Sequence, residues 1–405
     1  MKPIVRAGRM KPVHSDIRGP LFVEAMKRQK QGIDILKLNT GNPATFGFGL
    51  PDSIKNALME HMQDGVGYCD FKGMPQARQA ICDYETSKGI KGITPDDVFI
   101  GNGVSEVVSF ALTPLLNDGD EVLVPSPSYS LWGNSVYLED GKPVFYTCDE
   151  QANWYPDIQD IRSKITDKTK AIVIINPNNP TGVLYPKELL LEIIQIARES
   201  GLLIFADEIY DRLVMDGKQH ISLASLTEGV PVITLNGLSK SHCLCGYRCG
   251  WMVISGPREL TEDYRQGIIQ LTSLRLCANT MAQIVIPAAL DDMETPASMV
   301  RPGGRIYEQR EATVRELEKI DGLSFVKNDA AFYVFPKLDV KKFNITNDKQ
   351  FAHDLLDVTN ILLVPGSGFD WKDPDHFRIV MLPQADILSD AIRRMGTFLD
   401  GYKQK

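Results

Sequence analysis

The 405-residue sequence has no long apolar run, no long run of charges of one sign and few cysteines. No segment approaches the length of a membrane-spanning helix, and the basic start, residues 1–11, lacks the apolar core of a secretory signal. The net charge of −8 argues against a nucleic acid or an anionic membrane as the main partner. We therefore expect a soluble, cytoplasmic protein that binds small molecules.

The seven cysteines are an odd number and are scattered along the chain, which argues against a disulfide framework and suits a reducing compartment. Three of them, Cys243, Cys245 and Cys249, lie close together in the sequence. Their spacing lacks paired Cys-x-x-Cys arms, and no histidine follows at zinc-finger spacing. We expect no metal site here, and interpret these cysteines as small packed side chains.

The chain is too long for one ordinary core and is long enough for two domains. Between about residues 98 and 255, short apolar runs alternate with segments of helical length such as Pro186–Glu199. Nearly continuous apolar runs are typical of parallel strands that are buried on both faces. The predicted strands are Val98–Ile100, Glu121–Val124, Ala171–Ile175, Leu202–Ala206, Val232–Leu235 and Trp251–Ile254. This pattern predicts an α/β domain.

The pattern changes near residue 300. Arg301–Lys319 is typical of a charged amphipathic helix, Ala331–Pro336 and His376–Leu382 are strand-like, and a last helix is predicted from about Ala385 to Tyr402. We predict a large α/β domain over residues 45–299. Residues 300–405 would form a smaller α+β domain, with the N-terminal arm, residues 1–44, packed against it.

Polar, glycine-rich segments follow two of the predicted strands, where open α/β sheets place ligands. Residues 99–106, Phe-Ile-Gly-Asn-Gly-Val-Ser-Glu, lead through two glycines into a helix. The free N–H groups at a helix start attract phosphate. Residues 176–182, Asn-Pro-Asn-Asn-Pro-Thr-Gly, form a rigid polar turn. Either segment alone could be a structural turn, but similar polar clusters recur at the next strand ends after residues 176–182, which indicates a ligand site.

Ionisable residues at the next strand ends indicate the chemistry. Asp207 follows an apolar run and should be buried, where a carboxylate needs a cation such as a protonated pyridine nitrogen. Lys240 lies after the next strand, where shielding from water would disfavour its ammonium form and make it a usable amine for a Schiff base. Arg248 could bind a phosphate through its planar fork. An isolated Ser-Lys would more simply be a solvated surface lysine.

Together these motifs resemble those of a known family. Asn-Asn-Pro-Thr-Gly at 178–182, Asp-Glu-Ile-Tyr at 207–210 and Ser-Lys-x5-Gly-x-Arg-x-Gly at 239–250 look like the class I aminotransferases of the aspartate aminotransferase fold. Further segments are similar to the glutamate–pyruvate (alanine) aminotransferases, namely residues 16–20, 38–43, 102–106 and 174–180. The resemblance covers nearly the whole chain and implies the pyridoxal 5′-phosphate (PLP) dependent transferase fold type I, with a mostly parallel sheet.

The resemblance implies a role for each matching residue. Lys240 would form the Schiff base with PLP and move the proton between the substrate α-carbon and the cofactor, while Asp207 would pair with the pyridinium nitrogen. Asn179 and Tyr210 would hydrogen-bond the cofactor's O3′, and Tyr129 would stack on its ring. The residues implied to hold the phosphate are Gly103, Val104, Ser105 and Arg248, with Tyr68 reaching the phosphate of the neighbouring subunit. A homodimer is therefore implied.

Substrate recognition is implied for Arg378, Gly41 and Asn179. Arg378 matches the family's arginine for the α-carboxylate, and a bidentate pair would both bind and orient the substrate. An enzyme that takes glutamate as well as alanine must read a second carboxylate with a mobile group. We favour Arg18 in the N-terminal arm over Arg275, although a purely structural arm is the alternative.

The predicted function is PLP-dependent amino transfer between L-alanine and 2-oxoglutarate, which gives pyruvate and L-glutamate. The alternatives are a transaminase for aspartate, aromatic or branched-chain amino acids, or a PLP lyase, racemase or decarboxylase of the same fold. A non-enzymatic regulator would need a DNA-binding module, and the sequence shows no basic patch or room for one.

The sequence also departs from the family pattern. Gly237 stands where relatives often have a phosphate-binding serine, and Ser239 lies nearby. Residues 241–245, Ser-His-Cys-Leu-Cys, are unusual, because a basic residue often stands near the position of Cys243. Ser15 stands where an aromatic residue would be unsurprising. These departures bear on substrate preference and phosphate affinity.

Overall fold

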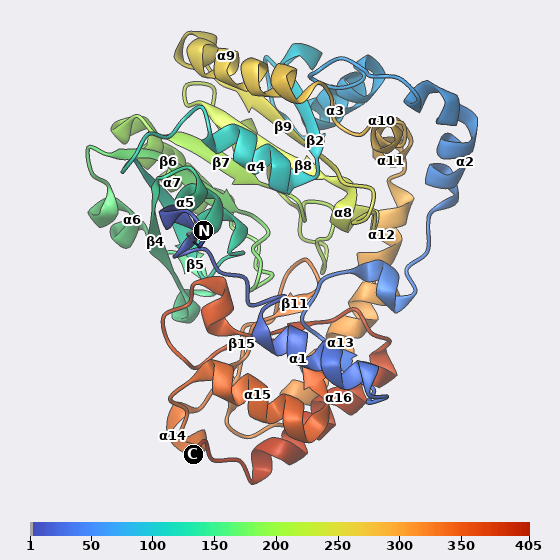
Figure 1. Ribbon diagram of the computed structural model, residues 1–405, viewed down its shortest axis with the longest axis vertical. Coiled ribbons are helices and arrows are strands. Elements are labelled where there is room, and N and C mark those ends of the chain that lie inside the picture. The colour runs from blue at the N-terminus through green and yellow to red at the C-terminus, as the bar shows by residue number, and fades with distance from the viewer. Residues whose placement is uncertain (1–2) are drawn as a thin grey trace.

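The computed structural model describes residues 3–405, and its larger part contains one eight-stranded sheet (Figure 1). The strand order across the sheet is β2-β9-β8-β7-β6-β3-β4-β5. The strands are β2 (Val98–Asn102), β3 (Glu121–Ser126), β4 (Lys142–Asp149), β5 (Tyr155–Pro156), β6 (Thr169–Ile175), β7 (Leu203–Asp207), β8 (Val232–Gly237) and β9 (Cys249–Ser255). Each of the six predicted strands is therefore present, within a few residues of its expected bounds.

The pairing is parallel among the central strands, from β4 through β3, β6 and β7 to β8. The prediction of parallel pairing is wrong for Trp251–Ile254 and for Val98–Ile100, because β9 runs antiparallel to β8 and β2, and the edge strand β2 pairs in this sheet with β9. An apolar run indicates that both faces of a strand are buried, but it does not indicate strand direction. The strands β4 and β5 were not predicted.

Helices cover both faces of the sheet because alternate strand residues point to opposite sides. On one face α4, α5 and α9 pack against residues such as Phe205, and on the other α7 packs against residues such as Ile204. The helices around the sheet are α2 (Asp52–His61), α3 (Pro75–Ser87), α4 (Val104–Leu112), α5 (Leu131–Leu138), α6 (Ile158–Lys164), α7 (Lys187–Ser200), α8 (Leu238–Ser241), α9 (Arg258–Arg275), α10 (Thr280–Gln283), α11 (Ile286–Asp291) and α12 (Glu294–Val300).

Helix α7 shows how the local sequence sets these elements. Pro186 precedes its first residue, and Gly201 ends it in the left-handed conformation with φ 65°, which glycine adopts at little cost. Leu190, Ile193 and Ala197 share one helical face and are buried against the sheet. The predicted helix over 186–199 is thus found one residue further along.

The second part of the molecule lies below the sheet in Figure 1 and combines the C-terminal hundred residues with α1 and β1. Its elements are α1 (Pro20–Lys30), β1 (Leu36–Lys37), α13 (Arg305–Leu317), β10 (Leu323–Ser324), β11 (Tyr333–Val334), β12 (Lys337–Leu338), α14 (Val340–Phe343), α15 (Asp348–Thr359), β13 (Ile361–Leu362), β14 (Val364–Pro365), β15 (Phe377–Val380) and α16 (Ala385–Asp400). Strand β1 pairs with β13, so the chain's start is tied to its end. The domain boundaries that we placed after residues 44 and 299 stay a prediction.

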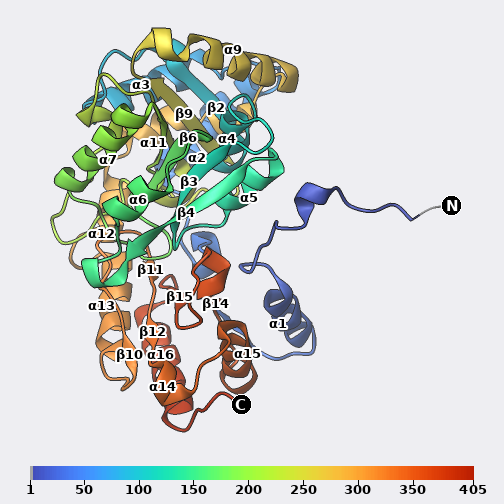
Figure 2. The ribbon, with the colours of Figure 1, turned by 90° about the vertical axis from the view of Figure 1, so that its left-hand side faces the viewer.

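The N-terminal segment extends away from the body of the molecule in Figure 2. It touches the large part at α5, where the Asn134 amide donates to the His14 carbonyl over 2.6 Å, and just after α5, where Arg9 pairs with Asp140 at 2.9 Å. Within residues 3–405, no single helix is long and apolar enough to cross a membrane, and α9 with α10–α11 reaches that length only as a pair bent by 119°.

Candidate active site

The carboxyl ends of β6, β7 and β8 face the second part of the molecule, and most of the predicted residues meet there. Asn179 follows β6, Asp207 ends β7, and Lys240 lies on α8, the short helix that follows β8. Arg378 comes from β15 on the opposite side. Because parallel strands end at one edge of a sheet, residues far apart in the sequence are brought to one place.

Asp207 is a buried carboxylate without a cationic partner among the described residues. The Trp132 Nε1–H donates to its Oδ2 over 3.0 Å, and it is only 5% exposed. Burial raises its pKa to about 6, against an ordinary value of 3.8. This is the environment that we predicted for Asp207, in which a bound cation would relieve the cost of the charge.

Lys240 points its amine toward the loop that follows β1, and its Nζ donates to the Gly41 carbonyl over 3.0 Å. Burial lowers the pKa of this amine, but the phenols of Tyr333 and Tyr129 and the thiol of Cys245 outweigh that effect, and the net pKa is raised. Our prediction that shielding would disfavour the ammonium form is therefore wrong for the chain by itself. Without a bound ligand, Lys240 is a cation surrounded by groups that stabilise its charge.

Arg378 is 1% exposed and has no carboxylate partner within residues 3–405. Its Nη1 donates to Asn179 Oδ1 over 2.9 Å, and its Nη2 donates to the Asn39 carbonyl. Its Nε has no hydrogen-bond partner in the described part of the chain. Burial lowers its pKa. A buried guanidinium that lacks an anion is unusual, because burying a charge without a partner is costly.

The turn from β2 into α4 meets the start of β9 at a close backbone contact. Gly103, with φ 83°, precedes α4, and a Cβ on Gly103 would lie 2.3 Å from Arg248 Nη2. A Cβ on Gly250 would lie 2.3 Å from the Val104 nitrogen. The exposed guanidinium of Arg248 thus lies beside Gly103, at the N-terminus of α4. Helix N–H groups and a guanidinium together form a cradle for a phosphate.

Tyr333 is a central residue of this site that sequence reasoning missed. Its hydroxyl oxygen lies 2.8 Å from that of Tyr210, and its ring lies 4.5 Å from the Arg378 guanidinium carbon. A Cβ on Gly41 would lie 2.4 Å from the Tyr333 hydroxyl, so only glycine fits at that position. We had predicted residues 331–336 only as a strand, and nothing in that apolar run distinguishes Tyr333 from a core residue.

Three predicted residues do not reach this centre in the single chain. Tyr68 is 84% exposed, and Arg18 is exposed without an ion pair in the described residues. Arg275 is already bound elsewhere, because its Nη1 pairs with Glu106 at 2.6 Å and its Nη2 donates to two backbone carbonyls. Tyr129 is half-buried beside the site, close enough to influence the pKa of Lys240.

The unusual residues around Lys240 have packing roles. A Cβ on Gly237 would lie 2.5 Å from the Cys249 carbonyl oxygen, so a serine at this position would collide with β9. The thiol of Cys245 donates to the Ser239 carbonyl over 2.9 Å, and that of Cys249 to the Ala282 carbonyl over 2.8 Å. These two thiols therefore bond to separate carbonyls.

A second buried charge cluster lies beside the turn that carries Asp207. Lys88 Nζ lies 2.8 Å from Glu85, 2.7 Å from Glu208 and 3.1 Å from Asp211. All three carboxylates are nearly inaccessible to solvent. The Asn236 amide also donates to Asp211 over 2.7 Å, which connects the cluster to the end of β8. The lysine therefore serves as the internal cation of this cluster.

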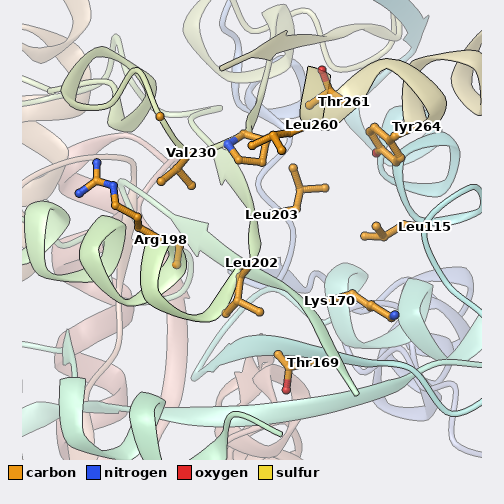
Figure 3. A pocket seen from close by; sticks show the side chains of 14 residues that line it. Leu115, Thr169, Lys170, Arg198, Leu202, Leu203, Val230, Leu260, Thr261 and Tyr264 are labelled. Carbon is orange, nitrogen blue, oxygen red and sulfur yellow. The ribbon is translucent and has the colours of Figure 1, made fainter. Parts of the chain in front are cut away.

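A surface pocket lies at the opposite, amino edge of the sheet (Figure 3). Thr169, Leu203 and Val230 line it near the starts of β6, β7 and β8. Its basic side chains, Lys170 and Arg198, come with no carboxylate in the lining. The pocket contains none of the predicted site residues, so the candidate active site is the edge at Lys240.

Comparison with known proteins identifies the family. The model named "Aminotransferase class I and II" matches residues 33–392. The chain belongs to this family. The predicted resemblance is thereby confirmed, and so is the prediction that the protein is an enzyme, an aminotransferase.

Individual relatives of this aminotransferase match over the full chain. The glutamate-pyruvate aminotransferase AlaA of Haemophilus influenzae is 50% identical over 404 residues, which cover 100% of both chains. An alanine aminotransferase of Mycobacterium tuberculosis is 44% identical, covering 100% of this chain and 94% of its own. The crystal structure of an aminotransferase from Escherichia coli has a TM-score of 0.98 at 47% identity, with 100% of both chains covered. These neighbours confirm the predicted fold class, the PLP-dependent transferase fold type I.

Proposed function

We propose that this aminotransferase uses PLP to move an amino group reversibly between L-alanine and 2-oxoglutarate, giving pyruvate and L-glutamate. The observation that carries the proposal is the buried guanidinium of Arg378, which has no anion among the described residues, lies 4.5 Å from the Tyr333 ring and is close enough to the Lys240 amine to influence its pKa. An α-carboxylate would supply the missing charge and two oxygens for the planar fork. The names of the most similar relatives support the choice of alanine and glutamate.

The described residues fit both ends of the PLP cofactor, its pyridine nitrogen and its phosphate. Burial raises the pKa of Asp207, which has no cationic partner in residues 3–405, and a protonated pyridine nitrogen would supply that cation. Because Gly103 and Gly250 carry no side chain, Arg248 and the start of α4 lie close together there, and their N–H groups would receive the phosphate. When bound, PLP supplies an electron-accepting ring that makes the α-hydrogen of an amino acid acidic.

The chain's own residues would then divide the work. Lys240 would hold the cofactor through its amine and, once released, carry the proton to and from the substrate α-carbon. Arg378 and Asn179, which are already hydrogen-bonded, would fix the α-carboxylate and so the direction of the Cα–H bond. Tyr210 would donate a hydrogen bond to the cofactor's O3′, and Tyr129 would cover the ring.

Arg18 in the N-terminal arm would bind the second carboxylate of glutamate. Asn39 ties the two regions together, because its side chain donates to the Ile17 carbonyl over 2.8 Å while its own carbonyl accepts from Arg378. Arg18 is therefore next to a residue anchored at the α-carboxylate site, yet its own side chain is exposed and free to move. Alanine would leave the arm unused, which suits an enzyme that accepts both substrates.

We further propose a cytoplasmic homodimer. Tyr68 is exposed in one subunit, and in the dimer it would reach the phosphate of the neighbouring subunit. All seven cysteines are free in this chain, as a reducing compartment would keep them.

The first experiment is an absorption spectrum of the purified protein, before and after L-alanine and then 2-oxoglutarate. The proposal predicts a PLP band that alanine converts to the band of pyridoxamine phosphate and 2-oxoglutarate restores. L-aspartate and L-tyrosine serve as control amino acids and should act much more slowly. A band that Lys240→Ala leaves unchanged would overturn the role of the lysine, and turnover without any keto acid would favour a lyase or racemase.

A further inference from the structure

Tyr333 contacts more of the proposed machinery than any role assigned so far explains. It lies on β11, opposite Val380 of β15, so its ring shares one face of this strand pair with Arg378. Its side chain is buried, with 2% exposed. Its hydroxyl meets Tyr210 over 2.8 Å and occupies the space that a side chain on Gly41 would need.

A bound cofactor would determine which of the two phenols donates the hydrogen bond between them. A phenol has one hydrogen to donate, and its oxygen can also accept. If Tyr210 donates its only hydrogen to the cofactor's O3′, the bond to Tyr333 requires Tyr333 to be the donor. Accepting this bond polarises the Tyr210 O–H and makes it a better donor, because hydrogen bonds in a chain strengthen one another.

The ring of Tyr333 has a second, separate contact. The Arg378 guanidinium carbon lies 4.5 Å from the Tyr333 ring centre and 4.6 Å from the Phe369 ring centre. The cation is thus held by two aromatic rings, while Asn179 and Asn39 hold its two terminal nitrogens. The two ring contacts fix the plane of the guanidinium without using any of its N–H donors, so they take none of the hydrogen bonds that a carboxylate needs.

We propose that Tyr333 is a positioning residue with two separable actions, in which its hydroxyl orients Tyr210 toward the cofactor and its ring face orients Arg378 toward the substrate carboxylate. This inference rests on the proposed function and deepens it. The two actions belong to different atoms of one side chain, so they can be removed one at a time.

Tyr333→Phe removes the hydroxyl and keeps the ring. The bound cofactor of the purified holoenzyme is titrated by absorption between about pH 5 and 10, without substrate. Weaker donation by Tyr210 makes O3′ more basic, so we expect the midpoint of the absorption change to move up by about half a pH unit. The KM values for alanine and 2-oxoglutarate should stay within about twofold, because the ring face remains.

Phe369→Leu is the matched control on the other side of Arg378. It removes the second ring and leaves both phenols, so KM for both substrates should rise about fivefold while the spectroscopic midpoint stays fixed. Tyr333→Leu should show both effects. The affinity of the apoenzyme for succinate, an unreactive dicarboxylate measured by calorimetry, should fall in Phe369→Leu and Tyr333→Leu but not in Tyr333→Phe.

A midpoint that stays within a tenth of a unit in Tyr333→Phe would overturn the action of the hydroxyl. Unchanged KM values and succinate affinity in a folded Phe369→Leu or Tyr333→Leu would overturn the action of the ring. If circular dichroism shows that Tyr333→Leu does not fold, Tyr333→Phe still tests the action of the hydroxyl and Phe369→Leu still tests the action of the rings on Arg378. Failure of the proposed function looks different, because then the wild type carries no PLP band, or Tyr210→Phe leaves the midpoint unmoved.

Discussion

Two cations near the active site, the largely buried Lys88 and the fully buried Arg378, have opposite surroundings. Lys88 lies within 3.1 Å of three carboxylates, whereas Arg378, which is more deeply buried, has only an amide oxygen and a backbone carbonyl as acceptors among the described residues. A cation with its anions in place contributes to folding. A buried cation that lacks its anions makes the free energy of folding less favourable, and this penalty falls when a ligand supplies the anion. The difference separates a structural charge from a binding charge.

The largest expected effect is on stability, at the first cation. Lys88→Met leaves three buried carboxylates without their common partner, so we expect the free energy of unfolding to fall by about 3–5 kcal/mol. Denaturant unfolding monitored by circular dichroism measures it. Lys88→Arg, which keeps the charge, should recover part of the loss. A loss below about 1 kcal/mol in Lys88→Met would show that the cluster does not depend on its lysine.

Replacing the second cation, Arg378, by methionine should have little effect on stability and a large effect on activity. Arg378→Met removes a charge that has no anion among the described residues of the folded chain, so the free energy of unfolding should change by no more than about 1 kcal/mol. We expect kcat/KM for alanine to fall about 100-fold, because the carboxylate loses its partner. Steady-state kinetics and denaturant unfolding on one preparation test both halves. A large loss of stability would remove the distinction between the two cations.

Asp207 extends the comparison to a buried anion and gives it a pH dependence. Burial raises its pKa to about 6 in the folded chain, so the folded protein binds this proton more tightly than the unfolded one. Stability is therefore lost as the pH rises from about 4 to 6, by about 2–3 kcal/mol, and stays lost above that range. In the apoprotein, Asp207→Asn should remove this loss. Equal pH profiles of unfolding for the two proteins would contradict it.

The smallest expected effect is at an exposed cation. Arg18→Ala should raise KM for glutamate and 2-oxoglutarate about fivefold and leave KM for alanine and pyruvate unchanged, because an exposed ion pair contributes about 1 kcal/mol. Arg6→Ala, at another exposed arginine of the same arm, is the control and should change neither. An unchanged affinity for glutamate in Arg18→Ala would show that the arm is purely structural.

The sequence placed the candidate site residues at strand ends better than it predicted their environments. Apolar runs located β7 and β8, so the ends carrying Asp207 and Lys240 could be placed, and burial of Asp207 followed from the run before it. The raised pKa of Lys240 could not be foreseen. It depends on Tyr333, Tyr129 and Cys245, which come from separate segments that only the tertiary fold brings together.

The parts of the fold that were missed have related causes. Strand β4 carries exposed and half-buried positions between buried ones, so it lacks the continuous apolar run that marked the central strands. The direction of β9 is set by its neighbours rather than by its composition. Tyr333 and Trp132 were passed over because an aromatic residue in an apolar context is usually a core residue, and their polar atoms find partners only through long-range contacts.

The antiparallel direction of β9 also keeps the connection between β8 and β9 short. Because β9 starts at the same edge where β8 ends, residues 238–248 form one short connection that carries both Lys240 and Arg248. A parallel strand would have required a crossover of a dozen residues or more. The span between the amine and the guanidinium is therefore set by loop length, and we expect an insertion between residues 241 and 247 to leave the sheet intact while the two ends of the cofactor could no longer be held at once.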